Sequence, residues 1–180
     1  MVISILLYCI SIMGSAQKGN DKIQIEKYGE RISRNNLKTH IYYLASDKLN
    51  GRAPGTEGEK LAQKYIIEEF KKDGLVPKGE NGYLQPFTYH MSKNPHDTVA
   101  NDGQEYKGSN VIGYIDNGQP YTIVIGAHYD HLGDDGRGNS LDPNPKGKIH
   151  HGADDNASGT AGVLELARYF SSKPAGSLPL

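Results

Sequence analysis

Hydrophobic residues recur every three to four positions in three segments, which predicts three amphipathic helices. They are expected over about 35–49, over 57–73, and from 158 or 159 to just before Pro174. The second opens with the capping-box pattern Thr56-Glu57-Gly58-Glu59, in which each terminal side chain satisfies the other residue's free amide. Gly74 follows that helix, where a left-handed cap is favoured.

Apolar runs predict strands between the second and third helices. Residues 83–90 form an expected edge strand, because Pro86 cannot donate to a central ladder. Residues 110–115 and 121–127 are expected strands joined by a turn. The second is apolar on both faces, as in a strand covered on both sides. We therefore expect an α/β fold, with a mixed, mostly parallel central sheet and helices on both faces.

The composition narrows the classes of function. The chain has 180 residues, of which 36% are hydrophobic and 23% charged, so it can form one globular domain with a core. A net charge of −1 and the lack of an extended basic run give no reason to expect a nucleic-acid partner. No phosphate-binding glycine motif and no nucleophile elbow occur, so nucleotide use and serine-hydrolase chemistry have no support.

The first 16 residues are uncharged and mostly apolar, and they predict a signal peptide over 1–16. The stretch is too short to span a bilayer, so no stable membrane insertion is expected after cleavage. A buried N-terminal strand or helix is the alternative. Cleavage would remove Cys9, the sole cysteine, which allows an oxidising compartment without demanding one. The mature protein is expected to be secreted or periplasmic.

Two short motifs, about two dozen residues apart, carry the side chains best suited to chemistry. The first ends in His128-Tyr129-Asp130, and the second holds Asp154 and Asp155 in a glycine-bounded turn before the third helix. Positions i and i+2 of a strand share a face, so His128 and Asp130 are expected to point the same way. They stand at the strand's carboxyl end, where open α/β sheets place their sites. Each motif alone is commonplace, and the second alone is most often a helix cap, but their combination favours a metal site.

The chemistry of these side chains suits divalent ions. Neutral imidazole is a good zinc ligand, and its second nitrogen usually donates to a carboxylate, a role open to Asp130 beside His128. Asp154 can supply a carboxylate that bridges two ions about 3.5 to 4 Å apart. Zinc takes about four ligands, so these residues amount to half of a site.

The loop over 131–153 joins the two motifs and has no hydrophobic periodicity. Loops of this length in compact domains are usually functional or disordered, and its position favours function. His131 can face the metals and His151 can contact substrate, although loop histidines are more often simply solvated. Together with Asp155, they are candidates for contact with substrate or for support of the ligands.

The two motifs, over 126–133 and 152–159, resemble the zinc-ligand motifs of the M28 peptidases, the co-catalytic zinc aminopeptidase family. Residues 44–52 and 110–113 extend the resemblance, which covers most of 38–172. It implies a zinc-exopeptidase-like fold and two Zn²⁺ ions. It further implies that His128 ligates one zinc, Asp130 orients His128 as part of the catalytic machinery, and Asp154 bridges both ions. A cis peptide bond between Asp154 and Asp155 is implied as well.

The family also uses a Glu-Glu pair that supplies the general base and a ligand, then another acidic ligand and a distant histidine. Glu68-Glu69 cannot substitute, because it lies on the solvent face of the second predicted helix. We therefore expect 17–180 to be the N-terminal portion of one zinc-peptidase catalytic domain, truncated at Leu180. The 180-residue chain alone is expected to lack peptidase activity.

Three functions follow from these observations. The favoured one is a secreted zinc-dependent aminopeptidase that hydrolyses the N-terminal bond of a peptide or protein substrate through a metal-bound hydroxide. The second is the same fold with carboxypeptidase or glutaminyl cyclase activity. The third is a non-catalytic binding module that has lost the metals. The presence of His128, Asp130 and Asp154 favours an enzyme, because a dead relative has no chemical need for them. The sequence leaves the oligomeric state open.

Overall fold

The computed structural model describes residues 34–91, 104–134 and 140–173, and the predicted signal peptide lies outside these ranges. The secondary structure is of mixed α and β type, which confirms the α/β part of the predicted fold class. The elements are α2 (Arg34–Leu44), η1 (Asp47–Arg52), α3 (Glu57–Lys72), β1 (Val76–Pro77), β2 (Leu84–Met91), β3 (Gln104–Val111), β4 (Gly113–Tyr114), η3 (Ala153–Ala157) and α4 (Ser158–Ser171).

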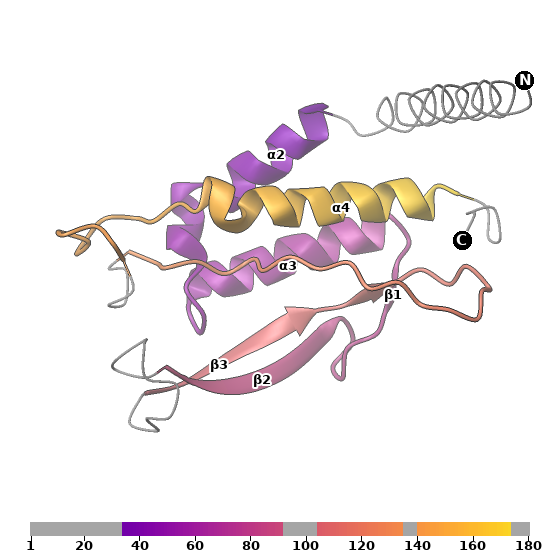
Figure 1. Ribbon diagram of the computed structural model, residues 1–180, viewed down its shortest axis with the longest axis horizontal. Helices are drawn as coiled ribbons and strands as arrows, with labels where there is room; N and C mark the ends of the chain where they lie inside the picture. The colour runs from indigo at the N-terminus through magenta and orange to yellow at the C-terminus, as the bar shows by residue number, and fades with distance from the viewer. Residues whose placement is uncertain (1–33, 92–103, 135–139, 174–180) are drawn as a thin grey trace, which may run out of the picture. The chain divides into compact units, whose positions relative to one another are not determined.

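Helix α3 packs against α4 and also contacts β3, and α2 packs against α4 (Figure 1). Two clusters of buried side chains join these elements. One cluster joins α3, α4 and the segment between α3 and β2, through Ile66, Phe70, Leu75, Tyr83, Leu164 and Ala167. The other joins α2, η1, α3 and η3, through Leu44, Leu49, Ala62 and Ala157. Tyr129 packs against both clusters, so the first sequence motif is anchored in the core.

Helix α3 follows its prediction closely. The side chain of Thr56 accepts from the amide of Glu59 at 3.4 Å, which is one half of the expected capping box. The other half differs, because the Glu59 carboxylate accepts from the amide of Gly55 at 2.6 Å. The Thr56 amide instead donates to a carbonyl oxygen one turn earlier. Gly74 has φ +76°, the left-handed cap that was predicted.

The first predicted helix is shorter than expected. α2 ends at Leu44, and a kinked 3-10 segment, η1, follows it. Asn50 and Gly51 have φ values of 45° and 71°, which helical backbone does not accommodate. A Cβ atom on Gly51 would stand 2.5 Å from the carbonyl oxygen of Gly133, so only glycine allows the loop after the first motif to approach η1 this closely.

The strand pairs of the described residues are antiparallel. β2 pairs with β3 in the register Leu84↔Val111, and β1 pairs with β4. The predicted edge strand over 83–90 is thus confirmed, and the strand over 110–115 is divided between β3 and β4. The expected mostly parallel sheet is not present among these elements.

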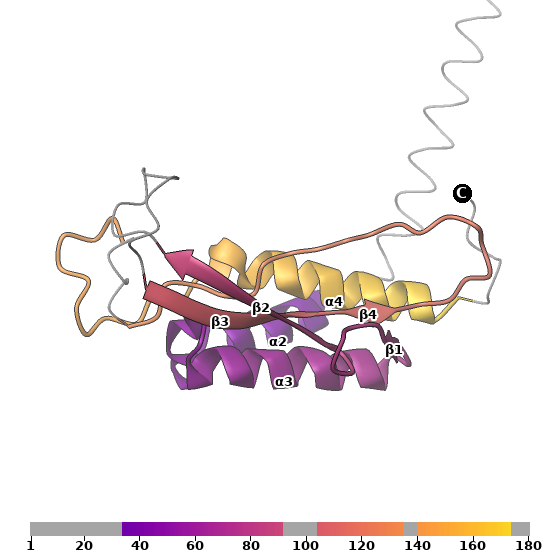
Figure 2. The same ribbon diagram turned by 90° about the horizontal axis from the view of Figure 1, so that it is seen from below.

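The prediction of a strand over 121–127 is wrong for the structure described. This segment is extended but has no ladder partner among the described residues, and the exposed fractions of Ile123 and Val124 are 77% and 89%. Both views show the extended chain after β4 running alongside the helices toward α4's beginning (Figures 1 and 2). An apolar pattern predicts burial, but a ladder also requires a neighbouring strand, which the described ranges do not supply.

Candidate metal centre

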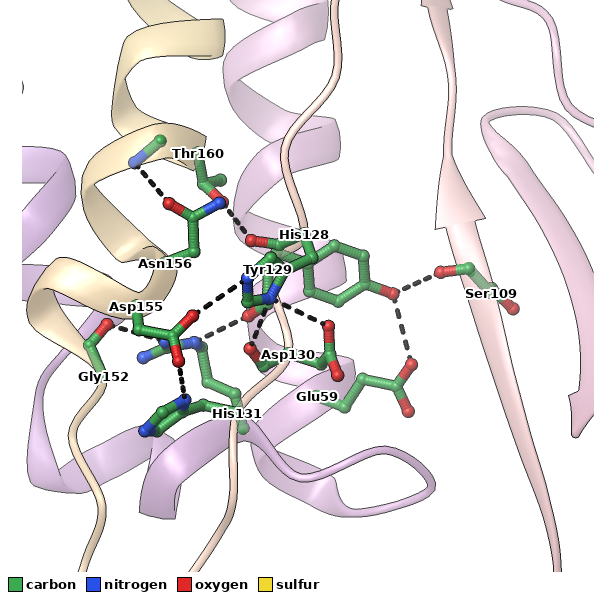
Figure 3. A network of polar contacts seen from close by, with 12 residues as sticks. Glu59, Ser109, His128, Tyr129, Asp130, His131, Gly152, Asp155, Asn156 and Thr160 are labelled. Atoms are coloured by element: carbon green, nitrogen blue, oxygen red, sulfur yellow. Dashed lines mark hydrogen bonds and ion pairs between the residues drawn. The ribbon is translucent and has the colours of Figure 1, made fainter. Parts of the chain in front are cut away.

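The fold brings the two sequence motifs together at the start of α4 (Figure 3). Nε2 of His128 lies 3.0 Å from Oδ1 of Asp155, and Nδ1 of His131 lies 3.7 Å from Oδ2 of the same carboxylate. The side chains of His128 and Asp155 are 54% and 66% exposed. An imidazole nitrogen and a carboxylate oxygen therefore face each other at a position that solutes can reach.

His128 is held from two further directions. Its Nδ1 lies 3.4 Å from Oδ1 of Asp130, so the carboxylate stands at the ring nitrogen opposite the one facing Asp155. The hydroxyl of Thr160 in α4 donates to the carbonyl oxygen of His128 at 3.1 Å. Asp130 thus occupies the place expected of a residue that orients the ring, and α4 fixes the backbone beneath it.

The structure places Asp155, and not Asp154, next to His128. The carbonyl oxygen of Asp154 accepts a hydrogen bond from the hydroxyl of Ser158 at 3.0 Å. Asn156 caps α4, since its Oδ1 accepts from the amide of Gly159 at 3.1 Å. The backbone at 155 and 156 is non-helical within η3, which separates the directions of successive side chains. The cis peptide bond joins Asp155 to Asn156, where the resemblance implied the preceding bond.

The other candidate histidines have different surroundings. Burial lowers the pKa of His131, although Asp155 opposes this effect, so its ring favours the neutral form that ligates metals. His151 pairs with Asp47 of η1, with 2.7 Å between Nε2 of the histidine and Oδ1 of the aspartate. His150 Nε2 is buried and has no hydrogen-bond partner among the described residues.

Tyr129 supports the motif from the opposite face. Its hydroxyl donates to the carbonyl oxygen of Ser109 and toward Glu59, and accepts from Gln63 at 3.0 Å. Burial, followed by the charge of Glu59, raises the pKa of Tyr129, so the phenol stays protonated. Sequence analysis missed this role, although the alternation of an extended chain already places Tyr129 opposite His128 and Asp130.

Arg52 is the second residue that sequence analysis missed. Its side chain is completely buried beneath both motifs, and it donates to carbonyl oxygens of each. No periodic pattern signals such a residue, because it lies in an irregular turn with φ 50°.

The residues fit a divalent metal in donor type, but their number is small. His128 and Asp155 supply the nitrogen and oxygen donors that zinc accepts. Within 34–91, 104–134 and 140–173, no group of three or more His, Cys, Asp or Glu side chains is arranged to hold a metal ion. Since zinc takes about four ligands, the donors described here provide part of a site.

Comparisons with known proteins concern the family and the fold. The model of peptidase family M28 matches residues 110–178, which include both motifs, so the resemblance to that family is confirmed. A leucine aminopeptidase precursor from Bacteroides thetaiotaomicron and a glutaminyl cyclase from Tannerella forsythia each have 21% sequence identity and a TM-score of 0.55. Each match covers 79% of this chain and 43% of the other, so the chain spans less than half the length of these structures. No curated protein matches the sequence.

Proposed function

We propose, on the premise that residues 110–178 belong to peptidase family M28, that this chain carries part of the active site of a zinc-dependent aminopeptidase. The observation that supports the proposal most strongly is the meeting of His128 and Asp155 at 3.0 Å, from two motifs joined by a long loop. The substrate is a peptide or protein with a free N-terminus. The protein acts outside the cytoplasm, as the apolar segment over 1–16 suggests.

His128 and Asp155 would hold the metal, and Asp130 would orient the imidazole. We therefore assign to Asp155 the bridging role that the resemblance gave to Asp154. A bound divalent ion polarises a carbonyl group and lowers the pKa of water, which is the chemistry that peptide hydrolysis needs. The chain's own contribution is to hold the imidazole and the carboxylate in a fixed, solvent-accessible arrangement.

The remaining donors come from outside the described residues in this proposal. The exposed apolar segment over 121–125 supports it, since such a run is typical of a strand that pairs on both sides. Pairing with further strands would give the mostly parallel sheet expected from the sequence. The 180-residue chain alone would then show no turnover.

Glutaminyl cyclase activity is the second candidate. It is favoured by the structural likeness to the Tannerella forsythia enzyme, which has the same TM-score as the likeness to the aminopeptidase precursor. The two activities differ in product. An aminopeptidase releases the first residue, whereas in cyclisation the α-amino group of an N-terminal glutamine displaces ammonia from its own side-chain amide and leaves a peptide of the same number of residues with an N-terminal pyroglutamyl ring.

The test uses the native protein, captured from its cells with an antibody raised against a peptide of α3. Aminoacyl anilides and a peptide with N-terminal glutamine are supplied, before and after chelation. The proposal predicts release of the first residue that chelation abolishes and zinc restores. Ammonia release from the glutamine peptide alone would favour the cyclase, and hydrolysis that survives chelation would contradict both.

A further inference from the structure

Arg52 has an environment that ordinary helix or core packing does not explain. Its side chain is 0% exposed, yet it donates to backbone carbonyl oxygens of the surrounding segments. Burying a guanidinium group is costly unless its N–H groups are satisfied. A buried arginine bonded in this way fixes the backbone segments that provide the oxygens.

The partners of Arg52 come from three separate segments. Nε donates to the carbonyl oxygen of Tyr129 at 2.7 Å, within the first motif. The terminal nitrogens donate to the carbonyl oxygens of His151 at 2.8 Å and of Gly152 at 3.0 Å, at the start of the second motif, and also to that of Leu44 at the end of α2. One rigid planar group therefore joins the backbone on both sides of the candidate metal centre to α2.

We propose that Arg52 is the positioning residue that holds His128 and Asp155 face to face before any metal arrives. The assignment of these two side chains as ligands rests on the proposed function, but the positioning itself does not. The backbone of Arg52 adds to the effect, because its carbonyl oxygen accepts from the amide of His131 at 3.2 Å. The preceding Gly51 lets this turn approach the loop that joins the motifs.

Charge and geometry predict opposite effects when Arg52 is removed. The guanidinium group is near enough to Asp130 and Asp155 for their charges to oppose the lowering of its pKa by burial. If Arg52 acted through charge alone, Arg52→Met would remove a positive charge that repels Zn²⁺ and so strengthen zinc binding. If it positions the ligands, zinc binding weakens despite the lost repulsion. Arg52→Lys keeps the charge but loses the planar fork, so it also weakens binding.

The experiment compares Arg52→Met, Arg52→Lys and the control Arg168→Met, each in the full chain and below its unfolding temperature. Arg168 pairs with buried Glu165 away from the motifs, so its variant reports lost stability without lost positioning. Calorimetric titration with Zn²⁺ is expected to show at least about tenfold weaker binding in both Arg52 variants, as for residues that support ligands. Affinity equal to that of Arg168→Met, or stronger than wild type, would overturn the proposal.

Amide hydrogen exchange tests the positioning without a metal. The amide of Ala157 donates to the carbonyl oxygen of Gly152, which Arg52 also contacts. Its exchange is expected to accelerate at least about tenfold in the Arg52 variants relative to amides in the middle of α3. Unchanged relative exchange would refute the proposal. If wild type binds no zinc but this acceleration occurs, the positioning role stands, and the proposed function is decided by its own test on the native protein.

A measurement on wild type covers the case in which the Arg52 variants do not fold. The Nε–H of Arg52 should be protected from exchange in the zinc-free protein, because it is buried and bonded to Tyr129. Exposed Arg34 is the reference. Exchange of the two groups at equal rates would show that Arg52 does not hold the motifs before metal binding, and the proposal would be wrong.

Discussion

Replacing Tyr129 by phenylalanine should destabilise the fold while leaving the candidate metal centre in place. The ring would still pack against both core clusters, so the apolar contribution is retained. The hydroxyl would be lost, together with its contacts to Ser109, Glu59 and Gln63. The backbone carbonyl of Tyr129 would remain bonded to Arg52.

The magnitude follows from the number of bonds that one hydroxyl can make at a time. It donates one hydrogen bond and accepts another, each contributing about 0.5 to 1.5 kcal/mol, and its removal leaves a carbonyl oxygen of β3 short of a donor. Gln63 keeps its bond to Glu59 at 3.0 Å, which limits the loss. We expect the free energy of unfolding to fall by about 2 kcal/mol.

Urea denaturation followed by circular dichroism at pH 7 measures this change. Tyr121→Phe is the matched control, because Tyr121 is 75% exposed and its loss of a hydroxyl should change stability by less than about 0.5 kcal/mol. Zinc affinity should be unchanged in both variants. A loss in Tyr129→Phe no larger than in the control would refute the view that the hydroxyl anchors the first motif.

Three further predictions concern other parts of the fold. Arg168→Met removes two hydrogen bonds to the carboxylate of Glu165, which is 1% exposed, and should lower the free energy of unfolding by about 2 kcal/mol in urea titrations. The loss is smaller than for a fully buried pair because Arg168 is partly exposed, and an unchanged midpoint would contradict this prediction. The pKa of Tyr65 is raised to about 12, chiefly by burial, so its stabilising contribution is complete below about pH 10 and is lost as the pH rises toward 12. Wild type should therefore lose about 1 kcal/mol more stability than Tyr65→Phe between pH 8 and 11, after allowance for solvent screening, and parallel pH profiles would exclude this cause. Gly58→Ala should destabilise the fold by at least about 2 kcal/mol, since the added Cβ would stand 1.9 Å from a carbonyl oxygen of η1. Gly162→Ala in α4 meets open space and should stabilise the fold by about 0.5 to 1 kcal/mol. Equal effects of the two substitutions in thermal unfolding would show that the structure relieves the crowding at residue 58.

Local patterns predicted the helices because their information is local. The bounds of α3 agree with prediction within one residue, since a capping residue and a glycine mark its ends and an apolar stripe lies between them. The strand over 121–127 shows the limit of the same reasoning. Its apolar residues predict burial, but whether they pair depends on neighbouring strands, which a local pattern does not contain.

The candidate site was predictable as a pair of motifs but not residue by residue. The meeting of His128 with the acidic turn followed from the positions of the two motifs in an α/β fold. The choice between Asp154 and Asp155 did not, because it depends on the backbone dihedral angles of a single irregular turn. The importance of Arg52 was equally inaccessible, since its partners are carbonyl oxygens up to 100 residues away.

The most direct test of the account is a calorimetric titration of the chain with Zn²⁺ in wild type, Asp155→Asn and Asp154→Asn. Both substitutions remove one negative charge from the same turn, so they differ chiefly in which carboxylate is lost. Because the carboxylate of Asp155 faces His128, its loss should weaken binding at least about tenfold, and Asp154→Asn should have a much smaller effect. Equal weakening, or stronger weakening in Asp154→Asn, would contradict the assignment of this metal centre.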